Sequence, residues 1–164
     1  MAAVFGGFPA IPTEDVLVFR TPSWGGNERV PFIAIGDDFG DLVHGILLSP
    51  ADKYGGKLVQ AFSDARTPQE LVASFERLVG KKARYEVMPD GPDGIETYGM
   101  SALITVKEMF AWVYAAGGNY YAEPNDINPA QELKRLAVAA QGGDEAGATL
   151  VTVEHFWQHI FMNA

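Results

Sequence analysis

The sequence predicts an α/β fold of the α+β kind, in which a small mixed sheet of about three to five short strands packs with about five helices. Two observations support this prediction. Strand-like and helix-like patterns alternate from Val30 to Met88, and within that span one helix carries recognisable signals at both of its ends. Alternation of this kind is typical of chains with some parallel strand pairing. We expect all 164 residues to form one domain, with 30–164 as its main body.

The first 29 residues are expected to form an arm and a loop. The N-terminal stretch is apolar but contains Gly6, Gly7 and Pro9 and has no basic group, so neither a signal peptide nor a membrane span is predicted. Residues 16–19 are apolar and predict a short strand. Trp24 follows in a glycine-rich loop, where it either covers the core, which we favour, or closes over a ligand.

Residues 30–62 predict a strand, a helix and a second strand. The apolar run 30–35 leads into an acidic turn, where we expect Asp38 to cap the next helix. His44 lies off the apolar face of that helix and is expected in solvent, and 58–62 is the next predicted strand. The helix face that should enter the core contains Phe39, Leu42, Val43, Ile46 and Leu47.

Residues 67–88 contain the clearest helix-to-strand unit of the chain. Thr67 is a natural N-cap, Pro68 occupies the first helical position, and Glu70 completes a capping box. Gly80 predicts the end of the helix in a left-handed conformation. The following run 83–88 alternates between apolar and polar residues, which predicts a half-buried strand.

The segment Tyr98–Ala116 predicts a helix with apolar side chains around nearly its whole circumference. Only Lys107 and Glu108 are charged, so most sides of this helix need partners. Ordinary core packing is the first interpretation, and a hydrophobic ligand pocket or a subunit interface are the alternatives. After Gly117 and Gly118, an extended segment 119–124 is expected.

The last part of the chain predicts two more amphipathic helices. Asn128 is expected to cap the first helix, a flexible loop follows at 141–148, and Thr152 opens the second helix. His155 and His159 in this last helix have the i, i+4 spacing that can hold a metal. They lie opposite its apolar face with no further ligand pattern, so no metal site is predicted.

Composition excludes several classes of protein. The net charge is −9, with 21 acidic against 12 basic side chains, which argues against nucleic acids and anionic membranes as partners. There is no Cys, so neither a disulfide nor a zinc–cysteine site is possible. We expect a cytoplasmic location.

Four motifs occur in order along the chain: Asp37-Asp38-Phe39-Gly40 running to Pro50, Thr67 to Leu71, Gly80-Lys81, and Glu108-Met109-Phe110 running to Tyr114. Together they resemble the C-terminal half of the NmrA-like family, a group of atypical short-chain dehydrogenases and reductases. The resemblance extends from about residue 30 to the C-terminus. It implies a region that contributes to the substrate side of a cleft, without the nucleotide-binding half with which such proteins usually begin.

Motifs for cofactor-dependent hydride transfer are missing. No glycine-rich dinucleotide fingerprint follows a predicted strand, and none of Tyr98, Tyr114, Tyr120 and Tyr121 is followed four residues later by Lys. Hydride transfer needs a cofactor and a site that holds it. We therefore expect that this chain binds no nicotinamide cofactor by itself.

These observations favour a cofactor-independent enzyme of secondary metabolism. It would hold an aromatic or polyketide-like metabolite in a hydrophobic pocket and promote isomerisation, cyclisation or dehydration by orientation and proton transfer. The candidate proton-transfer residues are Tyr121, Glu123, Asp38 and His44. The candidate substrate-binding residues are Trp24, Tyr98, Met100, Met109, Phe110, Trp112, Tyr114 and Tyr120.

A noncatalytic interpretation remains open. The same apolar surface would serve a binding or regulatory module that docks on a partner protein. On either interpretation we expect a homodimer, because the face that would meet a nucleotide-binding half must be covered.

Overall fold

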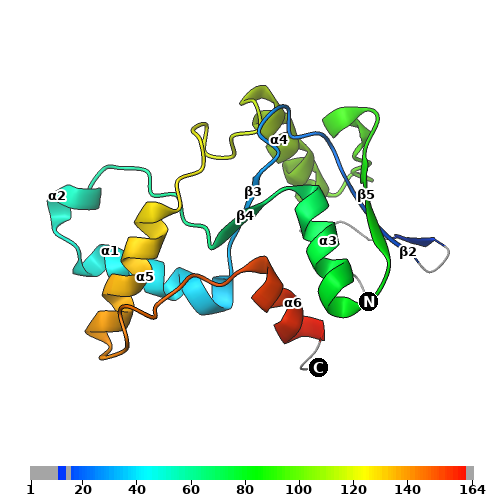
Figure 1. Ribbon diagram of the computed structural model, residues 1–164. Coiled ribbons are helices and arrows are strands. Elements are labelled where there is room, and N and C mark those ends of the chain that lie inside the picture. The colour runs from blue at the N-terminus through cyan, green and yellow to red at the C-terminus, as the bar shows by residue number, and fades with distance from the viewer. Residues whose placement is uncertain (1–10, 14–15, 162–164) are drawn as a thin grey trace.

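The computed structural model describes residues 11–13 and 16–161, and its elements match the predicted mixture of helices and short strands (Figure 1). Most of the predicted arm, 1–10, lies outside the described residues. The strands are β1 (Ile11–Thr13), β2 (Val16–Thr21), β3 (Val30–Phe32), β4 (Asp64–Arg66) and β5 (Ala83–Val87). The helices are α1 (Gly40–Leu48), α2 (Ala51–Tyr54), α3 (Pro68–Val79), α4 (Ser101–Ala115), α5 (Asn128–Ala140) and α6 (Val153–Phe161), with a π-helical turn η1 (Ile35–Phe39) and a 3-10 turn η2 (Gly91–Gly94).

The strands form two small sheets, of which the larger is mixed. Its order is β1-β2-β5, with β1 antiparallel and β5 parallel to the central strand, so that Leu17 lies opposite Ala83. The second sheet is an antiparallel pair of β3 and β4, with Val30 opposite Arg66. The predicted parallel pairing is therefore confirmed. It joins strands more than sixty positions apart in the sequence.

One predicted strand is wrong. Residues 58–62 form no strand, and pairing with β3 begins only at Asp64. The Gln60 side chain explains how the segment is held, because its amide donates to the carbonyl of Pro124 and accepts from the N–H of Asp126. No strand among the described residues lies alongside this segment, so its β-favouring side chains have no ladder to join.

The helix α3 follows its local signals. Thr67 Oγ1 accepts from the N–H of Glu70 at 3.1 Å, and Glu70 Oε2 accepts from the N–H of Thr67 at 2.9 Å. Gly80 ends the helix at φ 71°, a left-handed conformation that glycine adopts without steric cost. The predicted capping box and C-terminal stop are both confirmed.

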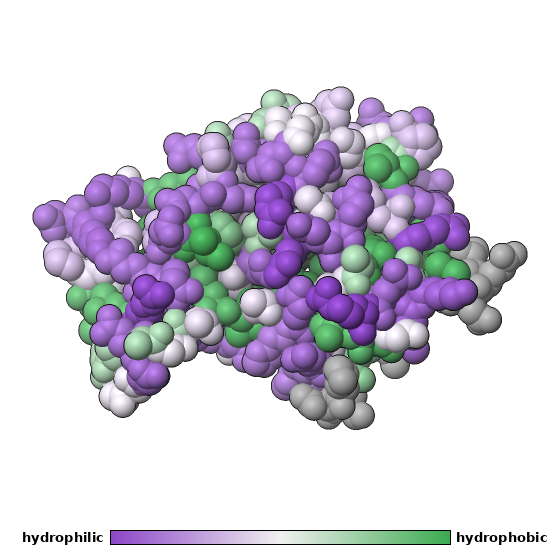
Figure 2. Space-filling model, in the orientation of Figure 1, coloured by the Kyte–Doolittle hydropathy of each residue, from purple (hydrophilic) through white to green (hydrophobic). Residues whose placement is uncertain are grey.

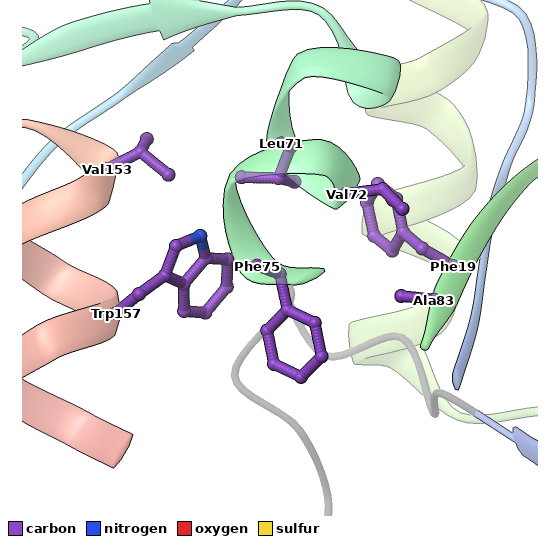
Figure 3. Close-up of a cluster of buried hydrophobic side chains, with 7 residues drawn as sticks. All are labelled: Phe19, Leu71, Val72, Phe75, Ala83, Val153 and Trp157. Carbon is purple, nitrogen blue, oxygen red and sulfur yellow. The ribbon is translucent and has the colours of Figure 1, made fainter. Parts of the chain in front are cut away.

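A buried cluster joins α3 to α6 and the larger sheet (Figure 3). The rings of Phe75 and Trp157 meet edge to face at 5.5 Å, an arrangement that aromatic pairs favour. Trp157 Nε1 donates to Ser74 Oγ at 3.0 Å, so the polar edge of the indole is satisfied inside the core. The cluster thereby fixes the C-terminal helix against the α3–β5 unit.

Two predicted helix caps are wrong. Ala34, not Asp38, precedes the π-helical turn that leads into α1, and Asp38 makes no cap hydrogen bond. Its side chain is fully buried and accepts from the N–H of Val151 at 2.8 Å, so tertiary contacts use the carboxylate. At α5 the flanking residue is Ile127, and Asp126 Oδ1 accepts from the N–H of Asn128 at 3.0 Å.

The helices α1 and α5 pack closely at one end of the molecule, where Figure 1 places them together with α2. A Cβ at Gly45 would lie 2.5 Å from the carbonyl oxygen of Leu133, so only glycine permits this approach. Lys134 on α5 pairs with Asp38 at 3.0 Å and with Asp41 at 2.7 Å. The β3–β4 ribbon connects this end to the rest of the fold.

Candidate functional site

An open pocket of about 320 Å³ lies where three segments meet: β3 with η1, residues 61–62, and the turn after α4. We call it the aromatic pocket. Its lining side chains are apolar apart from those of two tyrosines, which is the usual composition of a small-molecule site with few orienting groups. The pocket is lined by Pro31, Ile33, Ile35, Phe39, Ala61, Phe62, Tyr120 and Tyr121.

Tyr121 is the central polar group of this pocket. Its hydroxyl donates to the carbonyl oxygen of Ala61 at 3.2 Å, and its ring stacks on Phe62 with centroids 6.3 Å apart. The ring of Tyr120 meets it edge to face at 5.2 Å. Burial, and to a lesser degree the neighbouring Tyr120, raises the pKa of the Tyr121 phenol. The group is therefore protonated at neutral pH and acts as a hydrogen-bond donor.

Glycine packing positions the tyrosine pair. The N–H of Asn27 donates to the carbonyl of Gly117 at 2.8 Å, which fastens the loop before β3 to the end of α4. Gly118 has φ 83°, and a Cβ there would lie 2.2 Å from the carbonyl oxygen of Asn27. The chain then turns at Ala122, where φ is 62°. This left-handed conformation is energetically unfavourable for any residue that has a Cβ. The two tyrosines thus lie between fixed turns.

A second, polar recess of about 610 Å³ shares Phe62 with the aromatic pocket. Arg29 borders it, and the Arg29 guanidinium donates to the carbonyl of Ala65 at 2.6 Å and to Glu70 at 3.3 Å. Asn125 Nδ2 donates to the carbonyl of Arg29 at 2.8 Å, which fixes the orientation of that amide. Asn125 Oδ1 is buried and accepts no hydrogen bond from any described residue. A residue that lines this recess thus contains a buried acceptor with no partner among the described residues.

Of the eight substrate-binding residues predicted from sequence, the structure places only Tyr120 in the aromatic pocket. Trp24 and Phe110 are buried together with ring centroids 5.2 Å apart, and Met109 packs against the same cluster. These three belong to the core, the interpretation that we favoured for Trp24. The remaining four are exposed at the surface and line neither pocket: Tyr98, Met100, Trp112 and Tyr114.

Of the four predicted proton-transfer residues, only Tyr121 lines the pocket. Glu123 is exposed and lines neither recess. Asp38 is buried between Lys134 and Val151, and its carboxylate is occupied by them. His44 is half-buried on α1, with Nδ1 3.5 Å from the amide of Gln141. The structure does not bring these groups together.

Sequence reasoning missed most of the pocket wall. Phe39 was expected in the core, but its side chain is 46% exposed and lines the pocket instead. Phe62 was assigned to a strand rather than to a site. The sequence did contain a signal that Ile33 and Ile35 could line a pocket. They belong to an unbroken apolar run, and a two-stranded sheet cannot bury both faces of such a run.

Three glycines of the described residues are needed for internal packing. A Cβ at Gly25, Gly26 or Gly118 would meet the backbone of Tyr114, Gly117 or Asn27, respectively. The described part of the chain contains no cluster of three or more His, Cys, Asp or Glu residues suited to a metal. None of its helices combines the length and apolarity needed to cross a membrane.

Comparison with known proteins identifies relatives along nearly the whole chain. It is 44% identical over 165 residues to the NmrA-like family domain-containing oxidoreductase FrzB of Cladobotryum sp. This alignment covers 97% of the present chain and 49% of FrzB. The chain is 40% identical over 163 residues to the corresponding oxidoreductase hkm9 of Aspergillus hancockii, covering 98% and 48%. The chain thus spans about half the length of the curated relatives it matches. No protein-family model matches the chain.

Solved structures give the same fold. NmrA, described as a negative transcriptional regulator and solved in complex with NAD, superimposes with a TM-score of 0.57 over 94% of this chain and 45% of its own. The complex with NADP gives 0.56 over the same coverage. Sequence identity is 15% in both comparisons, so they support the fold alone. The curated relatives therefore assign the half of their length that this chain spans to NmrA-like proteins, and the solved structures agree with them in fold.

Proposed function

We propose that this chain forms the substrate-binding part of an NmrA-like oxidoreductase, and that the aromatic pocket holds a flat, mainly apolar organic molecule. The supporting observation is the position of Tyr121, whose phenol is hydrogen-bonded to Ala61 and whose ring stacks on Phe62 in a mainly apolar recess. Apolar walls supply affinity and a single donor supplies orientation, which is how small-molecule sites commonly divide these tasks.

Tyr121 would recognise an oxygen acceptor of the substrate. A carbonyl or ether oxygen seated against Phe62 can accept the hydrogen bond that now goes to Ala61. Because its pKa is raised, the phenol stays protonated and can donate a hydrogen bond to an oxygen on which negative charge develops. Removing this one neutral hydrogen bond would cost about 0.5–1.5 kcal/mol of binding.

Cofactor-independent isomerisation, cyclisation or dehydration is the second candidate. The observation in its favour is the phenol of Tyr121 at the pocket, since such chemistry needs a positioned acid. Burial raises the pKa of this phenol and so makes it a weaker acid. The reaction also needs a base, and no carboxylate or imidazole lines the aromatic pocket. Asp64 in the polar recess is paired with Arg66 at 2.9 Å and accepts from the N–H of Val153 at 3.1 Å. Substrate binding is therefore the function that this geometry supports best.

A matched pair of ligands tests the proposal. We would titrate the isotopically labelled protein with 2-acetylnaphthalene, a flat ketone, and with 2-ethylnaphthalene, which has the same shape without the oxygen, and follow both by NMR. We expect both to shift resonances of the aromatic pocket, and Tyr121→Phe to weaken the ketone by about two- to tenfold while leaving the hydrocarbon unchanged. Trp112→Phe, at an exposed residue outside the pocket, is the control.

Two results would reject this site. One is binding that leaves the Tyr120 and Tyr121 resonances unmoved. The other is an equal effect of Tyr121→Phe on both ligands, which would mean that the phenol recognises no oxygen. Turnover of an added metabolite without nicotinamide would instead favour the second candidate.

A further inference from the structure

The side-chain amide of Gln60 is buried and forms hydrogen bonds at both of its ends. The face of the molecule drawn in Figure 2 is mostly hydrophilic, whereas the polar side chain of Gln60 is only 7% exposed. Gln60 Nε2 donates to the carbonyl oxygen of Pro124 at 3.0 Å, and Oε1 accepts from the N–H of Asp126 at 2.9 Å. Exchanging the oxygen and the nitrogen would oppose two acceptors and two donors, so the orientation of this amide is determined.

The segment that contains Gln60 depends on side chains for its polar contacts. Figure 1 shows this segment between α2 and β4, and the loop between α4 and α5, both crossing the middle of the molecule. Within the described part of the chain, no backbone–backbone hydrogen bond involves residues 58–62. The Gln60 amide, and the Tyr121 hydroxyl that donates to the carbonyl of Ala61 at 3.2 Å, therefore hold the two segments together.

These contacts are reciprocal. Gln60 binds the backbone shortly after Tyr121, and Tyr121 binds the backbone directly after Gln60. The ring of Tyr121 also stacks on Phe62, with centroids 6.3 Å apart. Two segments that are fastened from both sides resist sliding past each other. The Gln60 amide thus helps to fix the position from which the phenol enters the aromatic pocket.

The backbone between these contacts is strained at Ala122, where φ is 62°. A residue with a Cβ keeps such a conformation only where the surrounding structure imposes it. The hydrogen bond of the Tyr121 hydroxyl lies directly before Ala122, and the bonds of Gln60 to Pro124 and Asp126 lie shortly after it. The strained turn is therefore held on both sides, and loss of either contact would let it relax and move the phenol.

Gln60 lies behind the wall of the pocket and not in it. Ala61, Phe62 and Tyr121 line the aromatic pocket and Pro124 lines the polar recess, but Gln60 lines neither. We propose that Gln60 is a positioning residue of the aromatic pocket, whose amide holds the Tyr121 hydroxyl where it can meet an oxygen of the ligand. This inference rests on the proposed function, because Gln60 acts through the same phenol.

The affinity ratio of the two naphthalene ligands provides the test. We call the preference for 2-acetylnaphthalene over 2-ethylnaphthalene the oxygen preference. Gln60→Met removes both hydrogen bonds but keeps a long, unbranched side chain. We expect it to lower the oxygen preference by about two- to tenfold, as Tyr121→Phe does, with little change in affinity for the hydrocarbon. Gln131→Met is the matched control, because Gln131 Nε2 donates to the carbonyl of Ala148 at 2.8 Å and the residue lines neither recess.

A double-mutant cycle distinguishes positioning of the phenol from general loosening of the fold. If Gln60 acts through Tyr121, Gln60→Met should lower the oxygen preference no further in the Tyr121→Phe background. In the free protein, Gln60→Met should also weaken the nuclear Overhauser effect between the rings of Tyr121 and Phe62, which the wild type holds in a stacked arrangement. Gln131→Met should leave this signal unchanged.

Three results would overturn the inference: an unchanged oxygen preference in Gln60→Met, an equal loss in Gln131→Met, or a further loss in the Tyr121→Phe background. If circular dichroism shows that Gln60→Met is unfolded, Gln60→Asn takes its place. Its amide is one methylene shorter and cannot span both partners at their present distances, and the same three results then decide.

The same measurements separate this inference from the proposed function. A wild-type protein without an oxygen preference, or one whose preference Tyr121→Phe does not change, would reject the proposed function and the role of Gln60 with it. An oxygen preference that depends on Tyr121 but not on Gln60 would reject the positioning role alone.

Discussion

Asp38 Oδ1 lies 3.0 Å from Lys134 Nζ, and this contact joins the turn before α1 to the middle of α5. The side chain of Asp38 is fully buried and that of Lys134 is 12% exposed. Burial acts to lower the pKa of Lys134, but hydrogen bonds to Asp41 and Asp38 outweigh it and raise that pKa. The ammonium therefore stays charged and neutralises a carboxylate that has no access to solvent.

Removing Lys134 should destabilise the fold strongly. In Lys134→Met the stem keeps its packing, but Asp38 loses its counter-ion while remaining buried, which typically costs about 3–5 kcal/mol. Urea unfolding at neutral pH measures the change. Lys53→Met is the control, because Lys53 pairs with Glu132 at an exposed site and should have little effect. Equal effects of the two substitutions would contradict the assigned role of Asp38.

The contribution of Asp41 should depend on pH. Its hydrogen bond with Lys134 outweighs the opposing effect of burial and lowers the pKa of this carboxyl below its ordinary value of 3.8. A lowered folded-state pKa stabilises the protein fully above the unfolded-state value, and the stabilisation is lost as pH falls through the folded-state value. Asp41→Asn should therefore lower the free energy of unfolding at pH 7, by about 1 kcal/mol, and by progressively less as the pH falls below 3.8. A difference that stays constant across urea titrations at pH 7, 5, 3 and 2 would contradict this.

Gly118 should tolerate no side chain. In Gly118→Ala the new Cβ would combine a positive φ of 83° with a 2.2 Å approach to the carbonyl oxygen of Asn27. We expect a loss of about 1–3 kcal/mol from overpacking in addition to about 1 kcal/mol from the backbone. Gly142→Ala is the matched control, because Gly142 has φ 77° but no atom within 4 Å of the added Cβ. Thermal unfolding should separate the two variants, and similar midpoints would show that the turn can move.

The Thr67 cap should be worth about 1 kcal/mol to α3. Thr67→Ala removes the hydroxyl that accepts from the N–H of Glu70, whereas Thr67→Ser retains it. Urea unfolding should show destabilisation in the alanine variant and little change in the serine variant. If Thr67→Ser destabilises the protein as much as Thr67→Ala does, the methyl group of Thr67 and not its hydrogen bond stabilises the helix.

The part of the fold that could be predicted depends on contacts between residues close in sequence. Thr67, Glu70 and Gly80 define α3 because a cap, a capping box and a left-handed stop each act within one helical turn. The strand that follows was recognisable from its alternation, and Thr152 does precede α6, with its hydroxyl accepting from the N–H of His155 at 3.2 Å. The family was also recognisable, since its motifs are local and their order is written in the chain.

The candidate site was only partly predictable. Aromatic and methionine residues around α4 indicated a pocket, yet Trp24, Phe110 and Met109 fill a core and only Tyr120 and Tyr121 meet a recess. Composition cannot separate these fates, because the same side chains suit a core and a ligand site. Which face of a helix is covered depends on elements that lie far away in sequence.

The amino-acid sequence by itself determined the alternating elements, the ends of α3 and the kinship of the chain, because each follows from short-range hydrogen bonding, periodicity or motif order. Only the tertiary structure decided that Asp38 is a buried ion-pair partner rather than a cap, that 58–62 has no strand beside it, and that Phe39 faces a pocket. The physical reason is the same in each case: burial and pairing are set by the partner that long-range packing brings close, and no local pattern encodes which partner that is.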